Sequence, residues 1–293
     1  MTRVFAISDL HVDYDQNMNW VKGLSNSDYK DDVLIVAGDV SDNVLKFAEA
    51  LEYLVRKFAH VSFVPGNHDL WIRKKESKNS LEKFYLLISI CSTLGVKTSP
   101  FMIGNKKQAI RIQPLFSWYL KPEEGPESLF LPKPGEDPNL GMWVDNYAVK
   151  WPEWNGFANA AEFFLKMNNW KIEEDGKVTI SFSHFLPRQD LIFGKKKPAD
   201  LKKAGFKDPA PKFNFSRVAG TAGLEKQLRQ VGSSAHIYGH QHRNRFMKID
   251  EVFYISHGLG YPKERAWAGI KDEEYLPKLI WDSENNFITG QEY

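Results

Sequence analysis

The sequence predicts an α/β fold built on a parallel sheet. Short apolar runs at 3–9, 32–39 and 60–67 have the length and composition of buried strands. Helical periodicity separates these runs, and the order strand, helix, strand, helix, strand is typical of parallel neighbours joined by right-handed crossovers. With 293 residues, 42% of them hydrophobic, the chain is long enough to bury a large core.

The other regular elements follow from the same periodicities. Apolar residues recur at helical spacing over 42–58 and again over 77–94, where Gly95 marks the expected end of the helix. Further helices are predicted at 157–170 and 221–231, and further strands at 177–186, 235–241, 252–258 and 277–283.

Two stretches lack this periodicity, and we expect them to be insertions in a single domain that spans 1–293. The acidic insertion, 116–156, is rich in Pro, Gly and Trp and has seven acidic residues against three lysines. The basic insertion is 188–220, of which 188–217 has nine Lys or Arg against three Asp. Aperiodic segments of this length are typical of functional lids and irregular insertions.

Each insertion leaves an alternative open. Lys195, Lys196 and Lys197 of the basic insertion are either solvated or attract an anionic substrate. The aromatic residues of the acidic insertion form either its own core or a platform for substrate, and they are Trp118, Tyr119, Trp143, Trp151 and Trp154.

The composition excludes several classes of protein. A net charge of +2 gives no overall attraction to nucleic acid or to an anionic membrane surface. The single cysteine, Cys91, rules out an internal disulfide and favours a reducing compartment. No window approaches the roughly 18 apolar residues of a membrane span, and the N-terminus lacks the pattern of a signal peptide. We therefore expect a soluble, cytoplasmic protein with no membrane partner and no strong nucleic-acid signature; its oligomeric state stays open.

Polar side chains gather where the predicted strands end. Ligand sites in open α/β sheets lie at the carboxyl ends of strands, so five strand ends would bring these side chains to one region. Mixed carboxylate, imidazole and amide donors suit Mn, Fe or Zn better than Ca or Mg. The alternative interpretation is a set of helix caps and satisfied strand-end polar groups. The seven candidate metal ligands are Asp9, His11, Asp39, Asn67, His184, His240 and His242.

The same residues lie in an ordered set of short motifs, which are "DLH" at 9–11, "GDVSD" at 38–42, "GNHD" at 66–69, "SH" at 183–184 and "GHQH" at 239–242. In this order the set resembles the calcineurin-like metallophosphoesterases. The resemblance implies a four-layer α/β/β/α sandwich with two central mixed sheets. It also implies two metal ions, Mn, Fe, Zn or a mixture. Asp9, His11 and His242 would hold the first ion, Asn67, His184 and His240 the second, and Asp39 would bridge both.

The implied activity is hydrolysis of a phosphomonoester or phosphodiester by a hydroxide that bridges the metals. Two cations can generate such a nucleophile at neutral pH and neutralise the phosphate oxygens. His68 would not bind metal but would protonate the leaving oxygen. Asp42 would orient His68 or, alternatively, would only cap the helix that follows it. Gly66 would allow the sharp turn before these residues.

One position departs from a branch of the superfamily. In the protein serine/threonine phosphatases an Arg follows G-D-x-x-D, and here that residue is Asn43, which disfavours a phosphoprotein phosphatase. Arg73, Arg188 and Arg243 lie near motifs, but none can be assigned to the phosphate. The alternative functions are a nucleotide phosphodiesterase or nuclease, which would need base-stacking aromatics, and a non-catalytic scaffold, which would be expected to lack ligands.

We expect mainly structural roles for four further polar residues. We expect Asp69 to support the turn or a neighbouring ligand. His60 and His236 lie at the starts of strands and are expected to be structural, and His257 either is structural or reaches the rim of the site.

Overall fold

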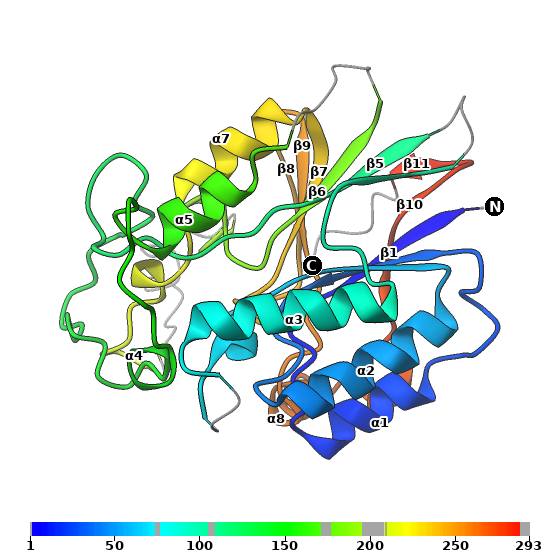
Figure 1. The fold of residues 1–293 in the computed structure, drawn as a ribbon, viewed down its shortest axis with the longest axis horizontal. Coiled ribbons are helices and arrows are strands. Elements are labelled where there is room, and N and C mark those ends of the chain that lie inside the picture. The colour runs from blue at the N-terminus through cyan, green and yellow to red at the C-terminus, as the bar shows by residue number, and fades with distance from the viewer. Residues whose placement is uncertain are drawn as a thin grey trace.

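Two sheets face each other between helical layers, which confirms the predicted four-layer sandwich (Figure 1). The computed structural model describes residues 2–73, 77–104, 109–170, 177–194, 208 and 210–287. The main apolar cluster contains side chains from both sheets, so the core lies between them.

The first sheet has the strand order β11-β10-β1-β2-β3. Its central strands β1, β2 and β3 are parallel, as predicted, because helices connect them; β10 is antiparallel to β1 and to β11. β2 is buried along its whole length, which accounts for its uninterrupted apolar sequence. The strands are β1 (Arg3–Ile7), β2 (Val33–Ala37), β3 (His60–Val64), β10 (Lys278–Asp282) and β11 (Asn286–Phe287).

The second sheet has the order β4-β5-β6-β7-β9-β8. Its four central strands are parallel, and the edge strands β4 and β8 are antiparallel to their neighbours, so this sheet is also mixed. The sequence did not predict β4, β5 or β8. The strands are β4 (Phe101–Ile103), β5 (Ile110–Pro114), β6 (Thr179–Phe182), β7 (Ser233–Tyr238), β8 (Arg245–Ile249) and β9 (Val252–Ser256).

Helices cover the outer faces of both sheets (Figure 1). The first sheet is covered by α1 (Asp15–Gly23), α2 (Val44–Lys57) and α3 (Ser80–Leu94), and the second by α5 (Ala160–Met167) and α7 (Ala222–Gln230). α3 ends at Gly95, in the left-handed conformation (φ 78°), as predicted. The remaining helices are short: α4 (Asp145–Ala148), α8 (Pro262–Trp267) and 3₁₀ turns at His68–Leu70, Phe215–Arg217 and Asp272–Glu274.

The two insertions pack against each other through paired charges. Glu136 of the acidic insertion accepts hydrogen bonds from Arg217 Nε (2.8 Å) and Asn214 Nδ2 (2.7 Å) of the basic insertion. Lys133 donates to the Phe213 carbonyl (2.6 Å) in the same segment. Lys195, Lys196 and Lys197 lie outside the described residues, so the question of whether they attract substrate stays open.

Most aromatic residues of the acidic insertion form its core. Trp118 and Tyr119 are buried. Trp151 packs edge-on against Trp118 with ring centroids 4.9 Å apart, and Trp154 packs on Trp151. These contacts favour the core interpretation over a substrate platform.

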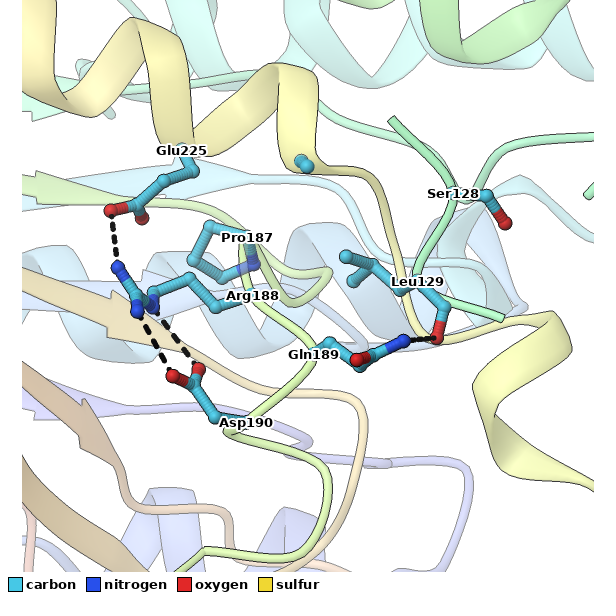
Figure 2. Close-up of a pocket in the computed structure, with 8 residues that line it drawn as sticks. Ser128, Leu129, Pro187, Arg188, Gln189, Asp190 and Glu225 are labelled. Carbon is cyan, nitrogen blue, oxygen red and sulfur yellow. Dashed lines mark hydrogen bonds and ion pairs between the residues drawn. The ribbon is translucent and has the colours of Figure 1, made fainter. Parts of the chain in front are cut away.

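The start of the basic insertion lines an open pocket of about 340 Å³ (Figure 2). Arg188 in this pocket pairs with Glu225 (3.0 Å) and Asp190 (2.9 Å), and its guanidinium also lies 3.2 Å from Asp250. With three carboxylates as partners, Arg188 is held in this pocket, which shares no residue with the candidate ligands. Among the residues that the structure describes, no helix is both long and apolar enough to cross a lipid bilayer.

His236, a residue of β7, is buried beside β6, as its structural interpretation requires. Its ring nitrogens lie 2.8 Å from Ser181 Oγ and 3.0 Å from Ser183 Oγ. Burial lowers the pKa of His236 to about 3. The imidazole is therefore neutral in the folded protein at every pH above about 4, whereas it titrates near 6.5 in the unfolded chain.

This difference predicts acid sensitivity. The pKa of His236 is lower in the folded state than in the unfolded state. The unfolding free energy therefore has its full value with respect to this residue above pH 6.5, and it decreases as the pH falls toward 3. The unfolding free energy of the metal-free protein, measured in urea, should therefore fall less between pH 7.5 and 5 in His236→Gln than in wild type, by up to about 2 kcal/mol. His60→Gln, which removes an exposed imidazole, is the control; equal pH slopes for His236→Gln and wild type would contradict the prediction.

Candidate metal centre

The seven candidate ligands follow the carboxyl ends of β1, β2, β3, β6 and β7, as the sequence predicts. Nine non-glycine residues of the described chain have a positive φ. Five of these nine are candidate ligands, with φ between 42° and 71°, namely Asp9, His11, Asp39, His240 and His242. This conformation is uncommon outside glycine and concentrates where surrounding structure enforces a functional geometry.

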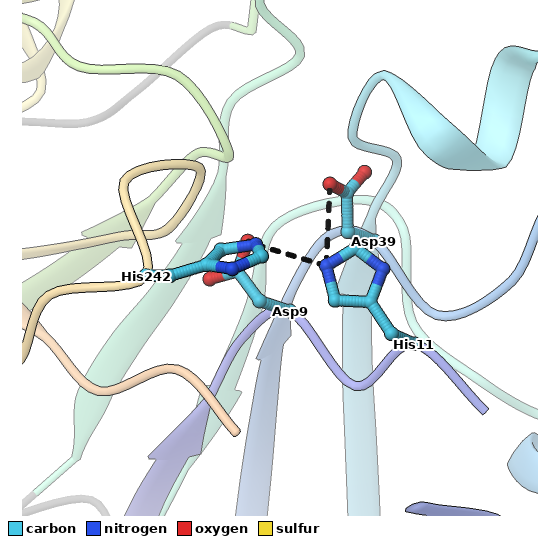
Figure 3. A group of neighbouring side chains, drawn as sticks. All are labelled: Asp9, His11, Asp39 and His242. Carbon is cyan, nitrogen blue, oxygen red and sulfur yellow. Dashed lines mark hydrogen bonds and ion pairs between the residues drawn. The ribbon is translucent and has the colours of Figure 1, made fainter. Parts of the chain in front are cut away.

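One group of ligand atoms comes from Asp9, His11, Asp39 and His242, which lie within 4.8 Å of one another (Figure 3). His242 Nε2 is 3.4 Å from Asp9 Oδ1 and 2.9 Å from His11 Nε2. Two imidazole nitrogens facing each other this closely would oppose their lone pairs unless a proton or a cation lay between them. The arrangement therefore fits a metal ion.

A second group shares Asp39 with the first. Its members Asp39, His184 and His240 also place ligand atoms within 4.8 Å of one another. His184 Nε2 lies 3.4 Å from Asp39 Oδ2 and 3.3 Å from Asn67 Oδ1, so the amide oxygen joins this group. The Asp39 carboxylate therefore belongs to both groups.

Three of the histidines have one ring nitrogen occupied by an oxygen acceptor, which leaves the other nitrogen for the centre. Such contacts fix the tautomer and the ring orientation of metal-binding histidines. The contacts join His184 Nδ1 to the Ala37 carbonyl (2.9 Å), His240 Nε2 to the Val218 carbonyl (2.9 Å) and His242 Nδ1 to Glu264 Oε2 (2.8 Å).

The charged groups of the candidate ligands compensate one another. Although burial opposes it, Asp39 raises the pKa of His184 to about 9, and Asp9 raises the pKa of His242 to about 10. Burial acts to raise the pKa of both carboxyls, but His242 lowers the pKa of Asp9 and His184 lowers that of Asp39. Protons and metal ions compete for the same nitrogens, so metal affinity falls as the pH falls.

Two glycines bring the ligand loops into contact. Gly38 has φ 83°, and a Cβ there would overlap the His184 ring. Gly66 was expected for its conformational freedom, but its φ lies outside the left-handed range. It is needed for space instead, because a Cβ on Gly66 would overlap the Asp39 carboxylate and lie 2.7 Å from His184 Cε1.

The comparisons with known proteins agree with this geometry. The sequence matches the family model of the calcineurin-like phosphoesterases over residues 2–244. The chain belongs to this family. As a calcineurin-like phosphoesterase it is a metal-dependent hydrolase of phosphoric esters, as its motifs predicted.

PptH of Mycobacterium tuberculosis matches this phosphoesterase over nearly its whole length, both in sequence and in structure. Acyl-carrier-protein phosphodiesterase PptH of Mycobacterium tuberculosis is 25% identical over 307 residues, which cover 99% of this chain and 90% of the relative. The crystal structure of phosphopantetheinyl hydrolase PptH from the same organism has a TM-score of 0.71 at 23% identity and covers 96% of both chains. At that identity the structural likeness establishes the fold.

His68 lies beside the phosphoesterase ligands without joining either group. Its backbone N–H donates to Asp39 Oδ1 (2.9 Å), and its ring packs 3.5 Å from the Trp71 ring centroid. His68 Nε2 is 3.4 Å from the Tyr261 hydroxyl and 4.0 Å from Asp39 Oδ2. Burial lowers the pKa of His68 to about 4, so its imidazole is neutral at pH 7 in the metal-free site.

Asp42 is engaged differently from either expectation. Asn43, not Asp42, caps α2, because its side chain accepts hydrogen bonds from the N–H groups of Leu45 and Lys46. Asp42 Oδ2 instead lies 2.5 Å from Arg73 Nε, and no hydrogen bond joins Asp42 to His68 in the described part of the chain. Asp42 thus places Arg73, whose guanidinium lies 4.6 Å from the centroid of the Trp71 ring.

Asp69 supports its neighbours, as expected. Its carboxylate accepts hydrogen bonds from four backbone N–H groups of the ligand loops. His257 does not reach the rim of the site; it stacks on Tyr275, and its Nε2 lies 2.9 Å from the Leu276 carbonyl. The structural interpretation is therefore correct for His257.

Sequence reasoning missed four residues that contact the ligands or His68: Glu264, Asp145, Trp71 and Tyr261. Glu264 carries only a local signal, because it stands at the third helical position of α8, where a capping box is common. Asp145 lies in the aperiodic acidic insertion and gives no motif signal. Trp71 follows the "GNHD" motif closely, but its packing on His68 is a tertiary contact that sequence spacing does not show.

The Glu264–His242 contact generates a test. In wild type, Glu264 Oε2 contacts His242 Nδ1 and accepts a hydrogen bond of 2.8 Å from the Tyr261 N–H. Glu264→Gln keeps a side-chain oxygen for both contacts but removes the negative charge. Outer carboxylates of this kind typically change metal affinity 10- to 100-fold, so we expect one Mn²⁺ to bind about tenfold more weakly. Metal content after equilibration with graded Mn²⁺ measures this; Glu274→Gln, at an exposed acid paired with Lys271, is the matched control. Wild-type affinity in Glu264→Gln would contradict the assigned role.

Proposed function

We propose that this phosphoesterase hydrolyses the phosphodiester that links a phosphopantetheinyl group to an acyl carrier protein. The observation that carries the proposal is the match to PptH, which extends over 99% of this chain and therefore includes both insertions. Specificity within a shared fold depends on such variable segments, so a relative that matches throughout them supports the same class of substrate.

In this proposal the seven candidate ligands hold two metal ions. Asp9, His11 and His242 would hold one ion, Asn67, His184 and His240 would hold the other, and Asp39 would be shared by both. Nitrogen and oxygen donors without thiolate suit Mn, Fe or Zn. When bound, two such ions supply a water-derived nucleophile at neutral pH and neutralise the phosphate oxygens.

The remaining residues bind the ester and move one proton. Addition of water breaks one P–O bond and yields a phosphomonoester and an alcohol, here the serine hydroxyl of the carrier protein. A serine alkoxide is a poor leaving group, so its oxygen must receive a proton as the bond breaks. His68 Nε2 is proposed as the donor, with Trp71 supporting its ring and the negative charge of the bound ester raising its pKa.

The competing functions have less support. Phosphoprotein phosphatase activity is disfavoured because the position of the phosphate-binding Arg is Asn43, whose side chain caps α2. Nucleotide diesterase or nuclease activity would need base-stacking aromatics, and Trp118 and Tyr119 of the acidic insertion cannot serve because they are buried. A scaffold without activity is disfavoured because all seven candidate ligands are present.

The substrate assignment is tested with a phosphopantetheinylated carrier protein. Wild-type enzyme with added Mn²⁺ should release the phosphopantetheinyl group, and mass spectrometry should show the carrier returning to its unmodified mass. Asp39→Asn, which removes the charge shared by both groups, should lose at least about 100-fold of this activity. Hydrolysis of aryl phosphodiesters with no change in the carrier would reject the substrate while leaving the phosphoesterase reaction in place.

The acid role of His68 gives a separate prediction. His68→Asn should retain both metal ions and should lower kcat by about 100-fold or more on the carrier protein, whose leaving group needs a proton. The loss should be much smaller on bis(p-nitrophenyl) phosphate, because its aryl oxide departs without one. Equal losses on the two esters, or loss of metal, would make His68 a binding residue instead.

A further inference from the structure

The side-chain amide of Asn67 has two chemically different ends, and only its oxygen can bind a metal ion. Asn67 Oδ1 lies 3.3 Å from His184 Nε2, whereas Asn67 Nδ2 donates to Asp145 Oδ1 at 2.9 Å. A half-turn of the amide would exchange the two ends and direct the NH₂ group at the centre. The site therefore needs an acceptor that holds Nδ2 on the far side.

Asp145 is built to be that acceptor. It begins α4 in the acidic insertion and is only 3% exposed. Trp71 Nε1 donates to the same oxygen as Asn67, at 2.6 Å, and the Tyr119 hydroxyl donates to the other oxygen at 3.1 Å. Three donors converge on one carboxylate, and a carboxylate accepts without donating, so the amide has only one favourable orientation.

Other contacts fix α4 beside the same half of the centre. The Ile72 N–H donates to the Ala148 carbonyl at 2.7 Å, which joins α4 to the chain that follows His68. Trp143, just before α4, packs edge-on against His240 with ring centroids 5.8 Å apart. The acidic insertion therefore contacts two residues of one group, Asn67 and His240.

We propose that Asp145 is a positioning residue for the second metal ion and that the acidic insertion supplies part of that ion's outer coordination shell. Asp145 acts through Asn67 by directing Oδ1 toward Asp39 and His184. The inference rests on the proposed assignment of Asn67, His184 and His240 to this ion.

The experiment counts Mn²⁺ ions per chain at graded free Mn²⁺ for wild type and three variants. Asp145→Leu removes both acceptor oxygens at similar volume, and we expect the second ion to bind about tenfold or more weakly while the first is unchanged. Asp145→Asn keeps an acceptor but loses the charge, and we expect a loss of about three- to tenfold. Tyr119→Phe, the matched control, removes one donor from the same carboxylate without altering the bond to Asn67, so both ions should bind as in wild type.

Circular dichroism and the unfolding temperature in chelator establish that each variant is folded. If folded Asp145→Leu binds two ions with wild-type affinity, the proposal is overturned. It is also overturned if Tyr119→Phe loses as much affinity for the second ion as Asp145→Leu does, because the contacts around Asp145 would then only attach the insertion to the rest of the protein. If Asp145→Leu does not fold, Asp145→Asn decides by the same measurement, and wild-type affinity there overturns the proposal. These outcomes can be distinguished from failure of the proposed function because the experiment uses no substrate. The proposed function would fail if wild type bound only one ion or if the carrier protein kept its phosphopantetheinyl group.

Discussion

The centre depends on one buried carboxylate that binds no metal in the proposed scheme. Asp69 accepts hydrogen bonds from the N–H groups of Asp39, Val40 and Ser41, which follow β2, and of Gly66, which follows β3. These bonds tie two neighbouring strand ends into one rigid corner. Burial and the nearby Asp39 raise the pKa of Asp69 to about 7, while the N–H donors of Gly66 and Ser41 favour the ionised form. The position of Asp39, which both groups of candidate ligands share, therefore depends on a residue two places beyond Asn67.

Conformational strain at the ligands is the consequence of this compact corner. Asp39 has φ 56°, and the loops after β1 and β7 repeat the same left-handed conformation at four more candidate ligands. A residue in this conformation costs on the order of 1 kcal/mol, so the surrounding hydrogen bonds must hold it in place. The bond from the His240 N–H to Asp9 Oδ1 (3.0 Å) does this between β7 and β1, which belong to different sheets. This hydrogen bond therefore joins the two sheets at the point where the two groups of candidate ligands lie.

The sequence predicts what is encoded locally. Buried strands such as β2 and the motif residues after them could be located because each signal lies within a few adjacent residues. β8 was missed because only Phe246 in it is buried, so it lacks the apolar run of a central strand, and β4 was missed because it has only three residues. Glu264 and Asp145 were missed for a different reason: they lie 22 and 78 residues from the ligands that they contact, and no sequence pattern links either of them to a ligand.

The two halves of the centre consequently differ in how they are supported. His242 of the first group is fixed by Glu264 of α8, and Glu264 also accepts a hydrogen bond from the Tyr261 N–H at the start of that helix. The amide of the second group is fixed by Asp145, whose insertion is also bound to the basic insertion through Glu136 and Arg217. The basic insertion is therefore bound to the acidic insertion through Arg217, and the acidic insertion contacts Asn67 through Asp145. Under the proposed role of Asp145, a change in the acidic insertion that shifts α4 would also move the Asn67 amide, so this insertion and the second group of candidate ligands would change together.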